Sequence, residues 1–272
     1  MGRKVCPKDK QHLDPFQFNF IVQIPGQTVA THLDAPWYYG ASRFEFPQWL
    51  LVAMTFSGLF QERFIDQVQV VAYLHEWIPT LDDRGDFVYY GRDSAEFEMI
   101  GAESRAGSGI DGSKSIHAAR TYRPHINPPQ LDKDKDSALV YNEQTDKWDL
   151  KMNEKIIARY NTTDLRTSIV YRARCFNSAH DAKRFNQKSY QDEFPNLTLS
   201  DILSTFTKDL IKRGNLSVKN LNEISRLDLA LLIINTYIQY PLPPRNAQVI
   251  PWNYCAMSRL YPKLESIMTL FC

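Results

Sequence analysis

Apolar and polar residues alternate in short runs over the first two-thirds of the chain, a pattern typical of β-strands that bury one face. In residues 67–74, for example, Val68 and Val70 alternate with glutamines. Proline and glycine between the runs supply turn chemistry. The predicted strands cover residues 16–24, 28–34, 49–56, 67–74, 87–90, 96–100, 114–122, 138–141, 148–150 and 165–175. Many short strands separated by turns indicate a sandwich or jelly roll.

Two segments between these runs are predicted to be loops. Gly107, Gly109 and Gly112 indicate a flexible connection ahead of the strand at 114–122. Prolines followed by alternating Lys and Asp over residues 127–136 indicate a solvated loop.

Near residue 196 the spacing of apolar residues becomes helical. Apolar side chains recur three and four residues apart from Leu199 to Ile211, with Ser200 as an early cap and Gly214 as a stop. Residues 221–237 predict a second, mostly buried helix, and residues 254–270 predict a last one.

The change of pattern predicts two parts in the chain. Residues 1–195 form a β core, and residues 196–272 form a helical extension that packs against the outer sheet of this core. The apolar faces of these helices suit core packing or a homodimer surface.

Charge and hydropathy exclude two classes of partner. The chain carries 32 basic and 31 acidic side chains, whereas a nucleic-acid surface needs a clear excess of Lys and Arg. No apolar run approaches the roughly 18 to 20 residues of a membrane span. Neither nucleic acid nor membrane is therefore expected as a partner.

The cysteines and the first residues bear on the compartment. Cys6, Cys175, Cys255 and Cys272 lie far apart and form no CxxC pair, so neither a zinc site nor a disulfide framework is supported. The basic start has no apolar stretch behind it, unlike a signal peptide. We expect a cytoplasmic protein with reduced thiols.

The residues that indicate chemistry are His32, Asp34 and His117. His32 and Asp34 are two residues apart in a predicted strand, so their side chains project from the same face. His117 lies in a later strand, and in a rolled β structure strands distant in sequence can lie side by side. Two histidines and one carboxylate leave three coordination positions open, which suits a non-haem Fe(II) that binds a bidentate acid and O₂.

The run from Gln27 to Ile169 resembles the core of the Fe(II)/2-oxoglutarate-dependent oxygenases. The resemblance is carried by His32-x-Asp34 closing an early strand, by a distal histidine on a late strand, and by Arg166-x-Ser168 on the last strand. The turn at residues 25–27 and the strand at 85–90, which starts at a glycine, are also similar to that family.

This resemblance implies a double-stranded β-helix core buttressed by helices, with Fe(II) as cofactor and 2-oxoglutarate as co-substrate. It implies an oxidation that releases succinate and CO₂. Arg166 and Ser168 share one face of their strand, where a guanidinium fork and a hydroxyl can grip the far carboxylate of the co-substrate. The gap between His117 and Arg166 is longer than is usual in the family, so Arg120 and Arg123 remain alternatives for this role.

The substrate site is predicted directly after the metal strand. Trp37, Tyr38 and Tyr39 could wall a pocket there, with Arg43 supplying charge to an anionic group of a small-molecule or peptide substrate. Aromatic residues after a strand can also simply pack, and this alternative stays open.

Other assignments remain open from the sequence. His12-Leu13-Asp14 repeats the ligand pattern in a polar, Lys-rich segment, and His125 is the nearest substitute for His117, although Pro124 disfavours a central strand there. Two further functions compete: a metal-free jelly roll that binds through residues 37–39, and a cupin-like metalloenzyme that does not use 2-oxoglutarate.

Overall fold

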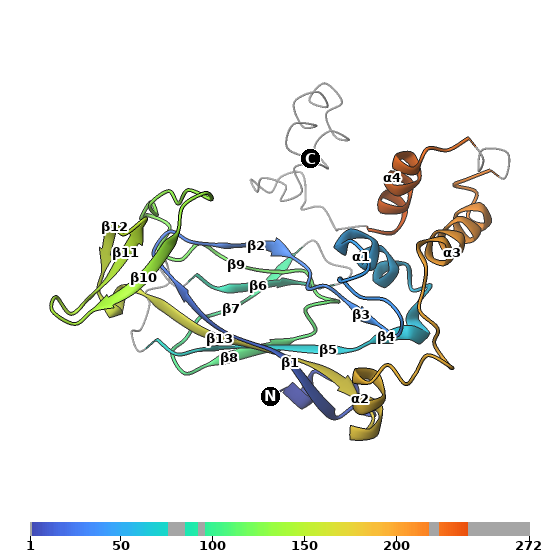
Figure 1. Ribbon diagram of the computed structural model, residues 1–272, viewed down its shortest axis with the longest axis horizontal. Helices are drawn as coiled ribbons and strands as arrows, with labels where there is room; N and C mark the ends of the chain where they lie inside the picture. Colours follow the sequence, from blue (N-terminus) through green and yellow to red (C-terminus); the bar gives the residue numbers. More distant parts are fainter. Residues whose placement is uncertain (1, 76–84, 92–95, 218–222, 239–272) are drawn as a thin grey trace.

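The computed structural model describes residues 2–75, 85–91, 96–217 and 223–238. Its body consists of two four-stranded antiparallel sheets that lie in two layers (Figure 1). A three-stranded sheet stands at one end of these layers, and helices gather at the other end. The prediction of a mainly β chain followed by helices is confirmed.

The first sheet brings distant parts of the chain together. Its strands follow the order β1 (His12–Gln23), β13 (Arg166–Phe176), β5 (Gln67–Tyr73) and β8 (Gly107–Ile110). In the antiparallel register Ser168 lies opposite Ile21 on one side and Tyr73 on the other. Because residues directly opposite each other on paired strands project from the same face, Ile21, Ser168 and Tyr73 share one face of the sheet. This is the inner face, where all three line a cavity.

The second sheet supplies the opposing layer. Its strands follow the order β2 (Val29–His32), β9 (His117–Ala119), β6 (Phe87–Tyr90) and β7 (Phe97–Ile100). His32 and His117 are direct cross-strand partners. Two histidines far apart in sequence are thereby placed side by side.

Two smaller sheets complete the β structure. The three-stranded sheet contains β10 (Ser137–Asn142), β11 (Lys147–Met152) and β12 (Lys155–Tyr160), and the two-stranded sheet contains β3 (Trp37–Tyr38) and β4 (Phe64–Ile65). The strands predicted at 138–141 and 148–150 are confirmed and pair with each other as a hairpin, whereas β12 was not predicted. Leu150 of the three-stranded sheet packs with Ile24 and Leu165, which joins this sheet to the end of the core.

The helices form a second apolar core. The α-helices are α1 (Gln48–Ser57), α2 (Ala179–Asn186), α3 (Leu199–Lys212) and α4 (Arg226–Tyr237), and the short 3-10 turns are η1 (Gly2–Lys4), η2 (Gln61–Arg63) and η3 (Thr162–Asp164). Buried residues of α1, α3 and α4, among them Leu51, Phe206 and Ile233, belong to one cluster. Within the described residues, α3 and α4 therefore pack on α1 and on Tyr38 and Phe64 of the two-stranded sheet, and the packing of the whole extension 196–272 on the outer sheet stays a prediction.

The N-cap of α3 is Thr198 and not Ser200, and its helical turns end just before Gly214. The helix expected at 254–270 lies outside the described residues. The domain boundary near residue 196 and the homodimer through these helices stay predictions. Within the described part of the chain, no helix is both long enough and apolar enough to cross a bilayer.

The strand predicted at 49–56 is wrong, because this segment is helix α1. Residues 50–54 are all buried, so their hydrophobicity follows no periodicity that separates a strand from a helix. The boundaries carry the missed signal: Pro47 is the N-cap and Gly58 closes the helix with φ of 69°.

The flexible connection predicted over the glycines at 107–112 is also wrong in part, because residues 107–110 form strand β8. At Gly107 an added Cβ would lie 2.6 Å from the carbonyl oxygen of Val71 on β5. Glycine is therefore used here for close approach of two backbones and not for flexibility.

The expectation of reduced thiols is wrong for two cysteines. Cys6 and Cys175 form a disulfide that joins residues 169 positions apart. Cys255 and Cys272 lie outside the described residues. Disulfides are rare in a reducing cytosol, so the pairing removes the basis on which a cytoplasmic location was expected.

Candidate metal centre

His32 and His117 present equivalent nitrogen atoms to one point between the sheets. The Nδ1 of His32 lies 2.7 Å from the carbonyl oxygen of Ala30, and the Nδ1 of His117 lies 2.8 Å from that of Ser115. A carbonyl oxygen only accepts, so both Nδ1 atoms donate and each Nε2 keeps its lone pair. This is the arrangement in which imidazoles bind metals.

Asp34 adds a carboxylate to the two imidazoles. Its backbone N–H donates to the carbonyl oxygen of Gly112 (2.8 Å), which fixes the chain just beyond β2. One ligand atom from each of His32, Asp34 and His117 lies within 4.8 Å of the others. Within the described residues this is the one group of three or more such side chains with metal-binding geometry.

The Asp34 carboxylate is held by Arg172 on β13. The Nε and Nη2 atoms of Arg172 donate to its two oxygens over 3.1 and 3.0 Å. Both side chains are largely buried, at 17% and 15% exposure. The pair fixes the orientation of the carboxylate relative to the histidines.

His117 is buried, which sets its protonation state, and a neighbouring amide contacts its ring. Burial lowers the pKa of its imidazole, and the guanidinium of Arg172 adds to this effect. The ring is therefore neutral at pH 7, as a ligand must be. The Nε2 of Gln69 lies 3.1 Å from the Nε2 of His117, and the Oε1 of Gln69 has no hydrogen-bond partner among the described residues.

Gly112 is required for the close packing of this centre. An added Cβ would lie 2.3 Å from Oδ2 of Asp34 and 3.1 Å from Cε1 of His117. Any side chain at this position would displace the carboxylate. The donor set of two nitrogens and one oxygen on one face fits a non-haem Fe(II).

A cavity continues from the histidines along the inner face of β13. Arg166, Ser168 and Arg172 line it together with His32 and His117. The three β13 residues alternate in sequence, so the pleat of one strand directs all of them inward.

Arg166 is a buried cation in this cavity. It is only 2% exposed, its Nη1 donates to Oε1 of Gln23 over 2.7 Å, and its guanidinium lies 4.9 Å from the ring centroid of Tyr73. Among the described residues Arg166 forms no ion pair with a carboxylate, and its Nε has no hydrogen-bond partner. A buried cation held by neutral groups is suited to receive an anionic ligand.

The residues considered as alternatives to Arg166, to His117 and to the His32-x-Asp34 pair do not line this cavity. Arg120 is exposed and Arg123 pairs with Asp164 over 2.8 Å, and neither lines the cavity. His125 is exposed. In the second His-x-Asp copy, Asp14 pairs with Arg174 over 2.6 Å.

The four predicted substrate residues divide into two pairs. Trp37 and Arg43 line a small cavity of about 130 Å³ that adjoins Asp34 and Arg172. Tyr38 and Tyr39 do not line this cavity, and the substrate role of all four residues stays a prediction. The Tyr38 hydroxyl hydrogen-bonds to Oγ1 of Thr55 inside the helical core, where burial raises its pKa, and Tyr39 stacks on Phe194 at 4.8 Å.

Sequence reasoning missed Arg172, Gln69 and Gly112. Arg172 follows Arg166 by an even number of residues on the same predicted strand, so a shared face could have been inferred. Gln69 stands in the alternating run 67–74, where a polar residue between valines also indicates a face. The role of Gly112 in the packing of Asp34 and His117 is visible only in the folded structure.

Comparison with protein families and with curated proteins found no match to this sequence. Among solved structures, the chain is similar to a Pseudomonas putida prolyl-4-hydroxylase, with 13% identity and a TM-score of 0.29 over 58% of this chain and 50% of that one. It is also similar to the non-heme monooxygenase ThoJ in a nickel complex, with 12% identity and a TM-score of 0.28 over 60% and 44%. The chain thus spans about half the length of these proteins or less. A likeness this distant carries no argument about activity.

Proposed function

We propose that the protein is an Fe(II)- and 2-oxoglutarate-dependent dioxygenase. The observation that carries the proposal is that metal-binding side chains and groups suited to bind a carboxylate lie in the same site. His32, Asp34 and His117 bring their ligand atoms within 4.8 Å, and Arg166 and Ser168 line the cavity that contains both histidines.

The strand order supports a double-stranded β-helix for this chain. Strands that follow one another along the chain alternate between the sheets, with β1 in the first, β2 in the second, β5 in the first and β6 in the second. β7 stays in the second sheet, after which β8, β9 and β13 alternate again. Eight strands wound between two antiparallel sheets are the pattern of a jelly roll.

In the proposed site His32, Asp34 and His117 hold the iron, and Arg166 with Ser168 holds the far carboxylate of 2-oxoglutarate. The bound iron supplies activation of O₂, coupled to oxidative decarboxylation of 2-oxoglutarate to succinate and CO₂. The protein residues orient the ligands: the two backbone carbonyls fix the imidazoles, and Arg172 fixes Asp34. Placement between two sheets keeps His117, Arg166 and Ser168 buried, at 5% exposure or less.

The cavity beside Asp34 is the proposed substrate entrance. Trp37 supplies an aromatic wall, and Arg43 is an exposed cation for which no carboxylate partner is found among the described residues. Arg172 is already engaged by Asp34, so Arg43 is the cation of this cavity that can pair with a ligand. The cavity therefore suits a small molecule or peptide with an anionic group.

The proposal is tested by anaerobic titration of Fe(II) and by succinate formation from 2-oxoglutarate in air. We expect one iron per chain in the wild type, lost in His32→Ala, Asp34→Ala and His117→Ala. The matched control is His12→Ala, which alters the other His-x-Asp copy and should keep its iron.

Iron binding with no succinate formed under any condition would favour the cupin-like enzyme. Absence of a bound metal would favour the binding jelly roll. Either result would overturn the proposal.

A further inference from the structure

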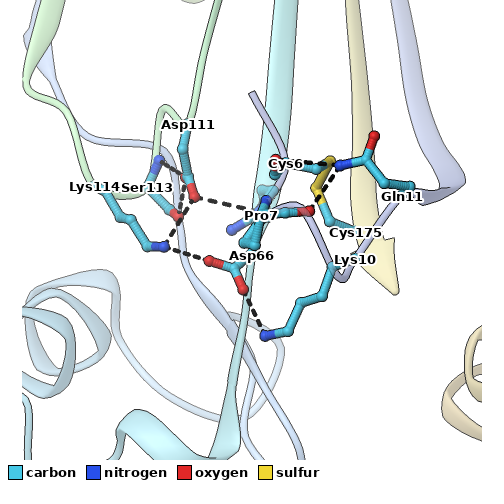
Figure 2. The surroundings of a disulfide bond; sticks show 10 residues. Cys6, Pro7, Lys10, Gln11, Asp66, Asp111, Ser113, Lys114 and Cys175 are labelled. Carbon is cyan, nitrogen blue, oxygen red and sulfur yellow. Dashed lines mark hydrogen bonds and ion pairs between the residues drawn. A yellow bond between two sulfur atoms is a disulfide. The ribbon is translucent and has the colours of Figure 1, made fainter. Parts of the chain in front are cut away.

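A charged cluster lies between the N-terminal segment and the loop that precedes β9 (Figure 2). The Nζ of Lys10 lies 2.6 Å from Oδ2 of Asp66, and the ammonium of Lys114 pairs with the other oxygen of the same carboxylate. Lys114 also lies 3.6 Å from Oδ2 of Asp111. Two lysines thus balance two aspartates, and the Asp66 side chain at their centre is only 6% exposed.

Asp111 organises the loop that follows it. Its Oδ1 accepts from the backbone N–H and the hydroxyl of Ser113 over 3.0 and 2.6 Å. Its carbonyl oxygen accepts from the N–H groups of Lys114 and Ser115 over 3.1 and 3.0 Å. The loop over residues 111–115 is therefore a closed turn whose shape depends on one aspartate.

This turn supplies two of the contacts that fix the metal ligands. The Gly112 carbonyl accepts from the backbone N–H of Asp34 over 2.8 Å. The Ser115 carbonyl accepts from Nδ1 of His117 over 2.8 Å. A shift of the turn would move the carboxylate ligand and one imidazole together.

The disulfide anchors the other end of the cluster. Cys6 is bonded to Cys175, whose backbone N–H donates to the carbonyl oxygen of Asp66 over 2.8 Å. From Cys6 the chain turns back to Lys10, held by Lys10 N–H to the Pro7 carbonyl (2.9 Å) and by the Gln11 side chain to the same oxygen (2.7 Å). Terminal segments fray unless they are tied down, and here the disulfide is the tie.

We propose that Lys10, anchored by the Cys6–Cys175 disulfide, is a positioning residue for the metal centre. It acts through Asp66 and Lys114 on the turn at 111–115, and this inference rests on the proposed metal site. Without Lys10, Asp66 has a single lysine partner. Lys114 is then drawn from Asp111 toward Asp66, and the turn behind Asp34 and His117 loses one of its contacts.

The first test is titration of the full chain with Co(II), whose visible absorption reports the geometry of its ligands. Removing a group that supports metal ligands typically costs 10- to 100-fold in affinity. Because Lys10 acts only through Asp66, Lys114 and the turn, we expect Lys10→Met to weaken Co(II) binding less, by about 3- to 10-fold. Lys10→Arg should restore most of this loss.

Lys8→Met is the matched control, because Lys8 is an exposed lysine of the same N-terminal turn with no ion pair found among the described residues. Its Co(II) affinity and spectrum should equal those of the wild type. If Lys10→Met lowers the melting temperature but leaves the affinity and spectrum unchanged, Lys10 is only a structural residue and the inference is overturned.

The second test removes the anchor. Tris(2-carboxyethyl)phosphine reduces the disulfide by two electrons to two thiols and is itself converted to the phosphine oxide. Reduced wild type should bind Co(II) more weakly by a similar factor, and Cys6→Ser with Cys175→Ser should match it. Reduced Lys10→Met should show no additional loss, because both changes act through the same lysine. Additive losses or an unchanged affinity after verified reduction would refute the link.

Co(II) binding by the oxidised wild type distinguishes a failure of the proposed metal site from a failure of the positioning role of Lys10. If it binds no Co(II), the proposed metal site itself fails. If it binds Co(II) and every variant binds equally well, only the positioning role fails.

Discussion

The guanidinium of Arg172 grips the carboxylate of Asp34 through two hydrogen bonds of 3.0 and 3.1 Å across the space between the two sheets. A metal ligand that could otherwise rotate is thus fixed from the opposite layer. The contact links strand β13, which carries the proposed co-substrate residues, to the end of β2.

Replacement of Arg172 tests this orientation. Arg172→Gln should weaken Co(II) or Fe(II) binding by about 10- to 100-fold, the usual effect of removing a partner of a metal ligand. Arg172→Lys should recover only part, since an ammonium cannot form the two-pronged contact. Arg184→Gln, which removes a half-buried arginine that pairs with Glu193, is the control. Tighter binding in Arg172→Gln would show instead that Arg172 competes with the metal for Asp34.

Gly112→Ala is expected to abolish metal binding while the chain stays folded. The new methyl group would lie 2.3 Å from Oδ2 of Asp34, and the carboxylate, as the end of a side chain, can yield where the backbone cannot. Metal titration and circular dichroism check the two halves of the prediction. Wild-type affinity in a folded Gly112→Ala variant would contradict the described packing.

Arg166→Ala should weaken 2-oxoglutarate binding by about 30-fold or more, since losing one partner of a buried charged pair costs about 2 to 5 kcal/mol. The iron should remain bound, because Arg166 is not among the proposed ligands. Arg123→Ala is the control, since Arg123 is engaged by Asp164. Anaerobic titration of the iron-loaded variants decides. A silent Arg166→Ala with a damaged Arg120→Ala or Arg123→Ala would reverse the assignment.

Asp66 should make the fold sensitive to acid. Burial acts to raise the pKa of its carboxyl, but hydrogen bonds from Lys10 and Lys114 outweigh it and hold the pKa below its ordinary value. The unfolded chain then binds this proton more readily, so the stabilisation is present above about pH 4 and is lost as the pH falls through the folded pKa.

Urea unfolding at several pH values measures this effect. At pH 7, Asp66→Asn should lower the free energy of unfolding by about 1 to 3 kcal/mol, the range for hydrogen bonds to charged groups. Below pH 4 the difference from wild type should shrink. Asp132→Asn removes an exposed partner of Lys135 and should change little. A difference that is constant with pH would show that Asp66 does not act through its charge.

The sequence predicts the fold best where residue types alternate along an element. Glutamines alternate with Val68 and Val70 at the start of β5, and buried positions alternate with half-buried ones over the first half of β13. Both strands were predicted to within a residue or two at each end. Helix α1 was not recognised, because residues 50–54 are buried all round and its amphipathic signal is absent. The disulfide was also not predicted, since the spacing of Cys6 and Cys175 carries no information about pairing.

The candidate site likewise contains residues that the sequence predicts and contacts that it does not. Histidines and carboxylates at fixed spacing are visible in a sequence, so His32, Asp34 and His117 could be proposed together. Contacts between the layers, such as Arg172 with Asp34 or Gln69 with His117, depend on how the two sheets face each other. Alternation along β3 directs Tyr38 into the helical core while Trp37 faces the cavity, a division that the run of aromatic residues at 37–39 does not reveal.

The bond between Cys6 and Cys175 also turns most of the protein into a covalent ring. Nearly all of both four-stranded sheets lies inside this ring, whereas helices α2, α3 and α4 lie outside it. Trypsin cutting at Lys133 or Lys135, in the exposed segment between β9 and β10, would therefore nick the ring without releasing a fragment. The nicked protein would migrate as one species in a non-reducing gel and separate into two only after reduction.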